Sequence, residues 1–203
     1  MKNNENGRSM VEMLGVLAII GVLSAGGLAG YSKAMFKHKL NNTMDQITML
    51  VTNIRTMYGT QRTYAGLSNY KAYQLGIVPA VMVSGTPAEN STTLTNPFKG
   101  KVTILPAASK ATDTAKTGAF VIGYEKLPKE ACIALATADF GTGAGSGFVG
   151  VNILAANTAI TKEDQSTVKV GAGTDGRAEG SAYTMENAIS GCQEMSSIIW
   201  KFY

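Results

Sequence analysis

The sequence predicts an α+β fold, in which one long N-terminal helix leads into a smaller globular head. The helix is predicted by an uncharged segment, Met13–Ser32, and by a helical apolar pattern that continues from it to Tyr58. The head is predicted by short apolar runs such as Phe148–Leu154, which read as strands between turn-rich segments. A chain of 203 residues is long enough for one ordinary domain with a core and an additional element.

The uncharged segment Met13–Ser32 has the length of a membrane span. Twenty residues of helix cover about 30 Å, the hydrocarbon thickness of a bilayer. A cleaved secretory signal is an alternative, because Ala25-Gly26-Gly27 offers small residues for cleavage. A buried core helix is the weakest interpretation, since such a helix at a chain terminus rarely runs so long without charge.

The helical pattern continues past any secretory cleavage point, which opposes the signal-peptide interpretation. Apolar residues follow one another at steps of three and four, as on one face of a helix. We therefore expect a single helix of about fifty residues, from near Ser9 to Tyr58, that is apolar all round in its first half. Glycines weaken a helix, so we expect bending or local melting within Gly21–Gly30. Gly26 and Gly30 also form a small-residue packing pattern. In the second half of the helix the apolar residues that share one face form a stripe, which consists of Leu40, Met44, Ile47, Val51, Ile54 and Tyr58.

The residues before the apolar segment carry a specific signature. A short polar leader ends at Gly7, an acidic residue (Glu12) follows five positions later, and the uncharged run begins directly afterwards. This arrangement resembles the prepilin signal of type IV pilins and related pseudopilins. The resemblance implies that a prepilin peptidase cuts between Gly7 and Arg8 and methylates the new terminal amine of Arg8.

The resemblance also implies a role for Glu12 in assembly. A carboxylate at the edge of the hydrocarbon is costly unless it is paired. In the family this acidic residue is thought to pair with the terminal amine of a neighbouring subunit. The alternative is a salt bridge between Arg8 and Glu12 within one helix, worth about 0.2–0.5 kcal/mol.

The remainder of the chain is similar to the type IVb branch of the family, which implies a head built on an antiparallel sheet. A connecting region is expected over Tyr64–Pro106, with a turn at Asn96–Val102 that leads into a strand. The elements expected after it are a strand at Gly118–Tyr124, a helix that begins at Leu127-Pro128 and carries Cys132, a strand at Phe148–Leu154, and a helix over residues 181–195 that carries Cys192.

This organisation divides the chain into a leader (residues 1–7), an apolar transmembrane or filament-core helix (8–32), the amphipathic half of the helix (33–60) and the head (61–203). Cys132 and Cys192 are the only cysteines. In an exported domain they are expected to pair, which bounds the region 132–192 by a disulfide, whereas separate thiols would suit the cytosol.

The sidedness of the helix receives conflicting signals. Lys33, Lys37 and Lys39 follow the apolar segment and outnumber Lys2 and Arg8 before it, which taken alone favours a cytoplasmic C-terminus. The leader and the cysteine pair favour the opposite orientation, with the N-terminus inside. We expect the bacterial inner membrane before assembly and an extracellular pilus afterwards.

Motifs that could carry enzymatic chemistry are weak. The S-x-x-K pattern at Ser68–Lys71 and the K-T-G pattern at Lys116–Gly118 have no S-D-N element after them. The G-x-G-x-x-G pattern at Gly145–Gly150 precedes a strand, whereas a phosphate site needs a helix there. The glycine-rich run 171–176 likewise reads as a loop. The single histidine, His38, falls on the long helix, so no nucleophile and base are grouped and no metal or other cofactor is expected.

These inferences favour a structural subunit of a type IV pilus, which is not an enzyme. Its expected partners are further copies of itself in a helical filament, the prepilin peptidase, the inner membrane and the pilus assembly machinery. A net charge of +4 is mild and by itself says little about nucleic-acid or membrane partners, and no specific nucleic acid is expected. The alternatives are a minor pilin or a secretion pseudopilin, and a monomeric membrane-tethered or secreted binding domain.

Overall fold

The computed structural model describes residues 5–61, 63–89, 91–109, 115, 117–141, 147–160 and 182–203, with side chains from residue 10 onward. The chain forms two compact units, residues 1–41 and residues 42–203. The glycine-rich run 171–176, Lys116 of the K-T-G pattern, and the first two residues of Gly145–Gly150 lie outside the described residues.

Helix α1 extends from Glu5 to Tyr58, and its residues up to Asn41 make up the first unit. The sequence predicts the same C-terminal end and a start four residues later. The local melting expected within Gly21–Gly30 is not observed, because every residue there is helical. Each glycine costs about 1 kcal/mol relative to Ala, which the apolar helix formers around these glycines outweigh.

The last part of α1, residues 42–58, belongs to the head and supplies one side of its core. Ile47 and Ile54 are fully buried, and Val51 and Tyr58 are 7% exposed, which confirms this part of the predicted stripe. Leu50 is also fully buried, so the buried face is wider than the predicted one. A wide apolar face is typical of a helix that packs on a sheet.

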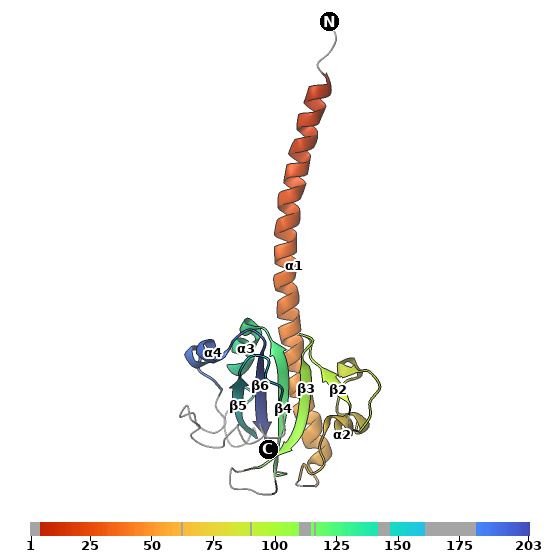
Figure 1. The fold of residues 1–203 in the computed structure, drawn as a ribbon, viewed down its shortest axis with the longest axis vertical. Coiled ribbons are helices and arrows are strands. Elements are labelled where there is room, and N and C mark those ends of the chain that lie inside the picture. The colour runs from red at the N-terminus through yellow and green to blue at the C-terminus, as the bar shows by residue number, and fades with distance from the viewer. Residues whose placement is uncertain are drawn as a thin grey trace. The chain divides into compact units, whose positions relative to one another are not determined.

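The head contains one six-stranded sheet in which all paired neighbours are antiparallel, in the order β1-β2-β3-β4-β6-β5 (Figure 1). This confirms the predicted fold class. The last strand along the sequence, β6, lies between β4 and β5. The strands are β1 (Val83–Ser84), β2 (Thr93–Thr95), β3 (Lys101–Ala107), β4 (Ala119–Leu127), β5 (Phe148–Leu154) and β6 (Ser196–Phe202).

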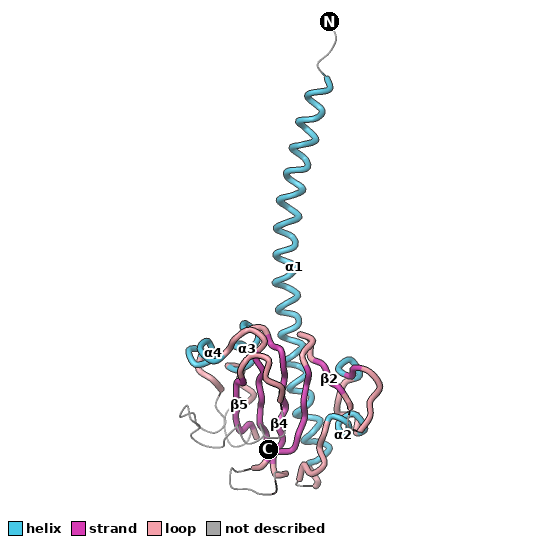
Figure 2. Tube along the Cα trace, in the orientation of Figure 1, coloured by secondary structure: helices cyan, strands magenta, loops and turns pink. Residues whose placement is uncertain are grey.

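Short helices flank the sheet (Figure 2). Helix α2 (Asn69–Gln74) contacts β3, and a 3-10 turn, η1 (Ala80–Met82), precedes β1. Helix α3 (Lys129–Ala136) contacts β5, β6 and helix α4 (Met185–Gly191). The predicted helix after Leu127-Pro128 is therefore present, with Pro128 at its N-cap. The C-terminal helix is shorter than predicted, and Cys192 lies at its C-cap.

The two faces of the sheet bury different side chains. Successive residues of a strand point to opposite faces. On β4, Phe120 and Tyr124 point to the face that carries the other large aromatic rings, where Phe120 stacks on Phe202 and Tyr124 meets the edge of Trp200. The opposite face is built from small and aliphatic residues, namely Ala107, Ala119, Val121, Ile160 and Ile199.

Candidate functional site

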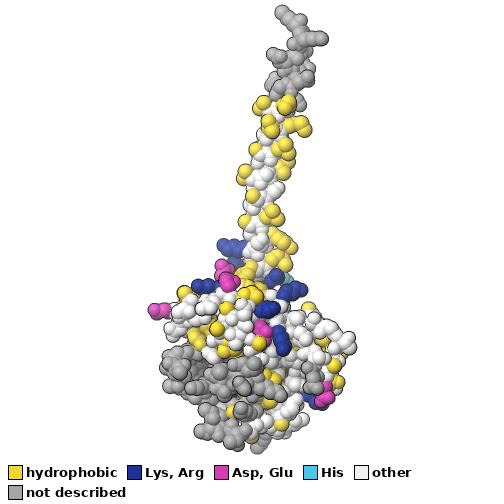
Figure 3. Space-filling view, viewed as in Figure 1, with side chains coloured by type: hydrophobic (Ala, Val, Ile, Leu, Met, Phe, Trp, Pro, Cys, Tyr) yellow, Lys and Arg dark blue, Asp and Glu magenta, His cyan; other side chains and the backbone are white. Residues whose placement is uncertain are grey.

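The first unit of the chain contains an apolar stretch of helix, and residues 10–34 of it are all exposed. An 18-residue window of α1 has a mean hydropathy of 2.1 and none of it is buried, so α1 is long and apolar enough to cross a membrane. Figure 3 shows hydrophobic side chains following one another along this helix. The large apolar residues of this helix that are at least half exposed are Met10, Val11, Met13, Leu14, Val16, Leu17, Ile19, Ile20, Val22, Leu23, Leu28 and Tyr31.

The glycines of this segment leave gaps in its surface. A methyl group added at Gly15, Gly21, Gly26, Gly27 or Gly30 would meet no atom within 4 Å. These glycines are therefore not required for packing inside one chain. Small residues allow the backbones of two helices to approach closely, and Gly26 and Gly30 lie one turn apart. The segment is thus suited to close packing against other helices or to contact with lipid.

The residues of the prepilin-like signature lie in the first turns of α1. The backbone of Gly7 and Arg8 is helical, and the structure does not describe the Arg8 side chain. Glu12 is exposed and precedes the uncharged run. Residues four apart share a helix face, so Arg8 and Glu12 are placed one above the other. The structure contains one copy of the chain, so cleavage, methylation and intersubunit pairing remain predictions.

The two cysteines form a disulfide that joins α3 to the end of α4. The Cα atoms of Cys132 and Cys192 lie 5.9 Å apart, and the two residues are 0% and 2% exposed. From the sequence, this pairing is expected only because the head is expected to be exported. The bond links segments 60 residues apart at one edge of the sheet.

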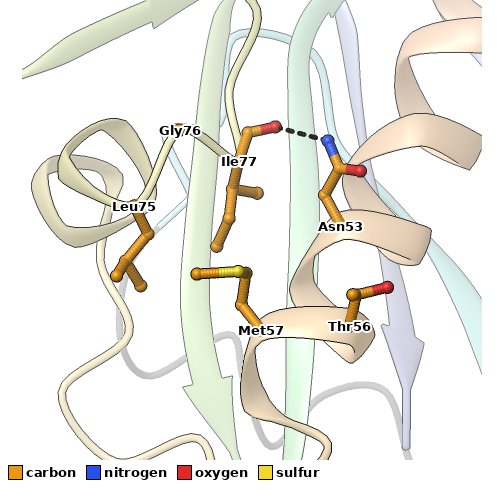
Figure 4. Close-up of a pocket in the computed structure, with 6 residues that line it drawn as sticks. All are labelled: Asn53, Thr56, Met57, Leu75, Gly76 and Ile77. Carbon is orange, nitrogen blue, oxygen red and sulfur yellow. Dashed lines mark hydrogen bonds between the residues drawn. The ribbon is translucent and has the colours of Figure 1, made fainter.

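A second set of contacts, which the sequence does not predict, joins the last part of α1 to the rest of the head. The Arg55 Nε donates a hydrogen bond to the main-chain oxygen of Tyr203 at 2.8 Å, and its guanidinium lies 5.6 Å from the centre of the Phe202 ring. Burial lowers the pKa of Arg55. On another side of the helix, the Asn53 side-chain amide donates to the main-chain oxygen of Ile77 at 3.0 Å (Figure 4). The only indication of these contacts in the sequence is that Asn53 and Arg55 are polar residues next to the apolar stripe.

Among the described residues, no three His, Cys, Asp or Glu side chains lie close enough together to hold a metal ion. His38 lies on α1 in the first unit. The described geometry therefore offers surfaces for packing, and the exposed apolar helix is the feature that most needs a partner.

Comparisons with known proteins identify the class. Residues 33–198 match the Bundlin family. The major structural subunits of bundle-forming pilus from Escherichia coli O111:H- and from Escherichia coli O127:H6 are each 27% identical over 196 residues, covering 97% of this chain and 92% of the relative. The crystal structure of a type IV b pilin from Salmonella typhi covers 81% of this chain and 97% of its own, with a TM-score of 0.50 and 21% identity.

The long helix, the antiparallel sheet and the disulfide-linked α3 and α4 define a type IV pilin fold. The chain belongs to the Bundlin family and is a type IVb-like pilin. The resemblance that the prepilin-like signature indicates is thereby confirmed.

Proposed function

We propose that this chain is the major structural subunit of a type IVb pilus and has no enzymatic role. The observation that carries the proposal is the first half of α1, which is apolar on all sides and uncovered. Exposed apolar area costs roughly 25 cal/mol for each Å² in contact with water, so this helix has to be surrounded by lipid or by other helices. Copies of this helix that pack on one another would provide such a surrounding outside the membrane, and the relatives named as major pilus subunits support this outcome.

The proposed sequence of events begins in the inner membrane. The chain inserts with its N-terminus inside and its head outside, where Cys132 and Cys192 can oxidise. Prepilin peptidase removes residues 1–7 and leaves Arg8 as the methylated first residue. The assembly machinery then moves the apolar helix from lipid into the filament core. Glu12 pairs there with the terminal amine of a neighbouring copy, because an unpaired carboxylate in an apolar core is costly.

The test is to express the chain in a host with a type IVb assembly system and to shear fibres from the cells. We expect the chain to be the most abundant protein of the fibres. Mass spectrometry should show an N-terminus at Arg8 with one added methyl group. A minor pilin or pseudopilin would share this N-terminus and be scarce in the fibres. An intact Met1, or a terminus near Gly27, would contradict the proposal.

A further inference from the structure

Two exposed lysines, Lys33 and Lys37, follow the apolar run of α1 and have no role in the function proposed above. We propose that this basic pair binds the phosphate groups of anionic phospholipids in the outer leaflet of the inner membrane before assembly. The inference rests on the proposed function, because the proposed orientation brings residue 33 to the outer surface of that membrane. It adds the class of lipid that the membrane-bound chain recognises.

The basic pair begins where the uncharged run ends. Lys33 is the residue after Ser32, and Lys37 lies one turn further along the same helix, so both lysines share one flank of it. Residues 33–44 contain three lysines and no acidic residue, and the third lysine, Lys39, is less exposed than the pair. This part of α1 therefore carries positive charge that no acidic residue of the same segment offsets.

The rise of the helix places the basic pair at the depth of lipid phosphates. The twenty residues Met13–Ser32 fill the hydrocarbon layer of about 30 Å, and the headgroups add roughly 5–8 Å on each side. At about 1.5 Å per residue, the Cα atoms of Lys33 and Lys37 lie about 2 Å and about 8 Å beyond Ser32. Side chains of a helix tilt toward its N-terminus, so the longer reach of Lys37 is directed back into the headgroup layer.

Tyr31 marks the same boundary of the membrane. It is 64% exposed and precedes Lys33 by two residues. Tyrosine rings are enriched where hydrocarbon meets water, and lysines near the end of a span keep their methylene groups along hydrocarbon and their ammonium groups among the headgroups. Along α1, an apolar run, an interfacial ring and two cations thus follow one another as hydrocarbon, interface and phosphate do in a bilayer.

The other end of the span has no comparable excess of charge. Lys2 and Arg8 are offset by Glu5 and Glu12, so the side chains of residues 1–12 carry no formal net charge. An anionic lipid is therefore attracted to the end that carries the basic pair. Lysines on the outer side of a span oppose the usual distribution of positive residues. Anionic lipids that bind them would offset this cost for as long as the chain stays in the membrane.

The first test measures which lipid the chain selects. The full-length chain is reconstituted in phosphatidylcholine vesicles with a trace of spin-labelled lipid, and electron paramagnetic resonance gives the share of label held at the protein surface. One lysine at an anionic surface favours binding by about fivefold. Averaged over all lipids around the helix, labelled phosphatidylglycerol should be held about two- to fivefold more strongly than labelled phosphatidylcholine. Equal binding of the two labels would overturn the inference.

Variants of the basic pair identify the groups responsible. Lys33→Gln/Lys37→Gln should abolish the preference for phosphatidylglycerol, whereas Lys33→Arg/Lys37→Arg keeps both cations and should retain it. The matched control is Lys71→Gln/Lys99→Gln, which removes the same charge from exposed positions of the head and should leave the preference unchanged. An equal loss in this control would show that net charge alone attracts the lipid, and would overturn the site.

The position of the charge is tested by moving it along the helix. Lys33→Gln/Thr48→Lys keeps the net charge and shifts one cation about 22 Å along α1, to an exposed position outside the headgroup layer. This variant should lose as much preference as Lys33→Gln alone. Salt at 1 M, which shortens the Debye length to about 3 Å, should also reduce the preference of the wild type. A full recovery with Thr48→Lys would contradict the proposed depth.

A different partner for the basic pair would be an acidic group of a neighbouring copy in the filament. In that case Lys33→Gln/Lys37→Gln would lower the amount of sheared fibre and leave the lipid preference unchanged, which would overturn the inference and keep the proposed function. The lipid measurement uses the membrane-bound chain and needs no filament. A wild type that selects phosphatidylglycerol and forms no fibres would therefore overturn the proposed function alone.

Discussion

Asn96, in the turn between β2 and β3, is bound to Glu125 on β4: the Asn96 side-chain amide donates a hydrogen bond to the main-chain oxygen of Glu125 at 2.9 Å. The Asn96 side-chain oxygen accepts from the main-chain N–H groups of Phe98 and Gly100, each at 2.9 Å. Asn96 is 4% exposed, so water cannot replace these partners. The same turn needs glycine at position 100, because any side chain there would overlap the main-chain oxygen of Glu125.

Asn96→Ala should destabilise the head by about 2–4 kcal/mol. The substitution removes three hydrogen bonds of about 1 kcal/mol each and leaves buried main-chain groups unpaired. The measurement is urea unfolding of the full chain in detergent, followed by the fluorescence of Trp200, which is the only tryptophan and is fully buried. Asn187→Ala, at an exposed position on α4, is the control and should change the unfolding free energy little. Equal effects of the two substitutions would refute the role of the Asn96 turn.

Removal of the disulfide should cost about 4 kcal/mol on the chain-entropy model, because the bond closes a loop of 60 residues. The variant Cys132→Ser/Cys192→Ser leaves no free thiol, and its unfolding can be compared with that of the wild type with and without dithiothreitol. Dithiothreitol should destabilise the wild type and leave the variant unchanged. A wild type that is insensitive to the reductant while the bond is shown to be reduced would contradict the prediction.

Glu12→Ala should block or slow assembly while the chain still enters the membrane, because the substitution removes the carboxylate proposed to pair with a neighbour's terminal amine. The two readouts are sheared fibre and the amount of chain in the membrane fraction. Glu12→Asp, which keeps the charge, is the control and should assemble better than the alanine variant. Normal piliation with alanine at this position would exclude the pairing role.

The head should lose stability above about pH 10 through Tyr124. Tyr124 is fully buried, and burial raises the pKa of its phenol above the usual value of 10. Below pH 10 both the folded and the unfolded states hold the proton. Above it the unfolded state loses the proton first, so the unfolding free energy falls by up to about 1.4 kcal/mol for each pH unit.

Tyr124→Phe removes this titration, and its unfolding free energy should fall less steeply than that of the wild type between pH 10 and 11.5. Burial also raises the pKa of Tyr58, but the Tyr58 phenol is less completely enclosed. Tyr58→Phe is therefore the control and should flatten the pH dependence less. Identical slopes for the wild type and Tyr124→Phe would show that Tyr124 does not govern the loss.

The sequence predicts the long helix well because its two halves have simple patterns. The uncharged run and the three- and four-residue steps from Ile47 to Tyr58 depend on local spacing alone, and the structure reproduces both. The strand Phe148–Leu154 was also predicted with its observed bounds, because an apolar run with glycine-rich sequence before it stands out. The helix after Pro128 follows from the restriction that proline places on a first turn.

The sheet order and the contacts of the head could not be predicted in the same way. The sequence pattern predicts no element over β6, although all seven of its residues, Ser196–Phe202, are buried. A strand covered on both faces lacks the alternation that reveals a half-buried strand. The hydrogen bond from Arg55 to Tyr203 joins residues 148 positions apart, and the one from Asn96 to Glu125 joins residues 29 positions apart. No local sequence pattern predicts either of them. The proposed roles of Gly7, Arg8 and Glu12 rest on the resemblance, since they concern other molecules.

The central place of β6 sets the time at which an exported head can become complete. Strand β5 pairs with β6, and β4 pairs with β6 on its other side, so residues 148–154 have no described sheet neighbour until residues 196–202 arrive. In the proposed orientation the head crosses the membrane in the order of its sequence, so β6 is delivered after every other described strand. The head therefore closes its sheet only at the end of translocation, and a chain halted before residue 196 would remain open to proteases and chaperones outside the membrane.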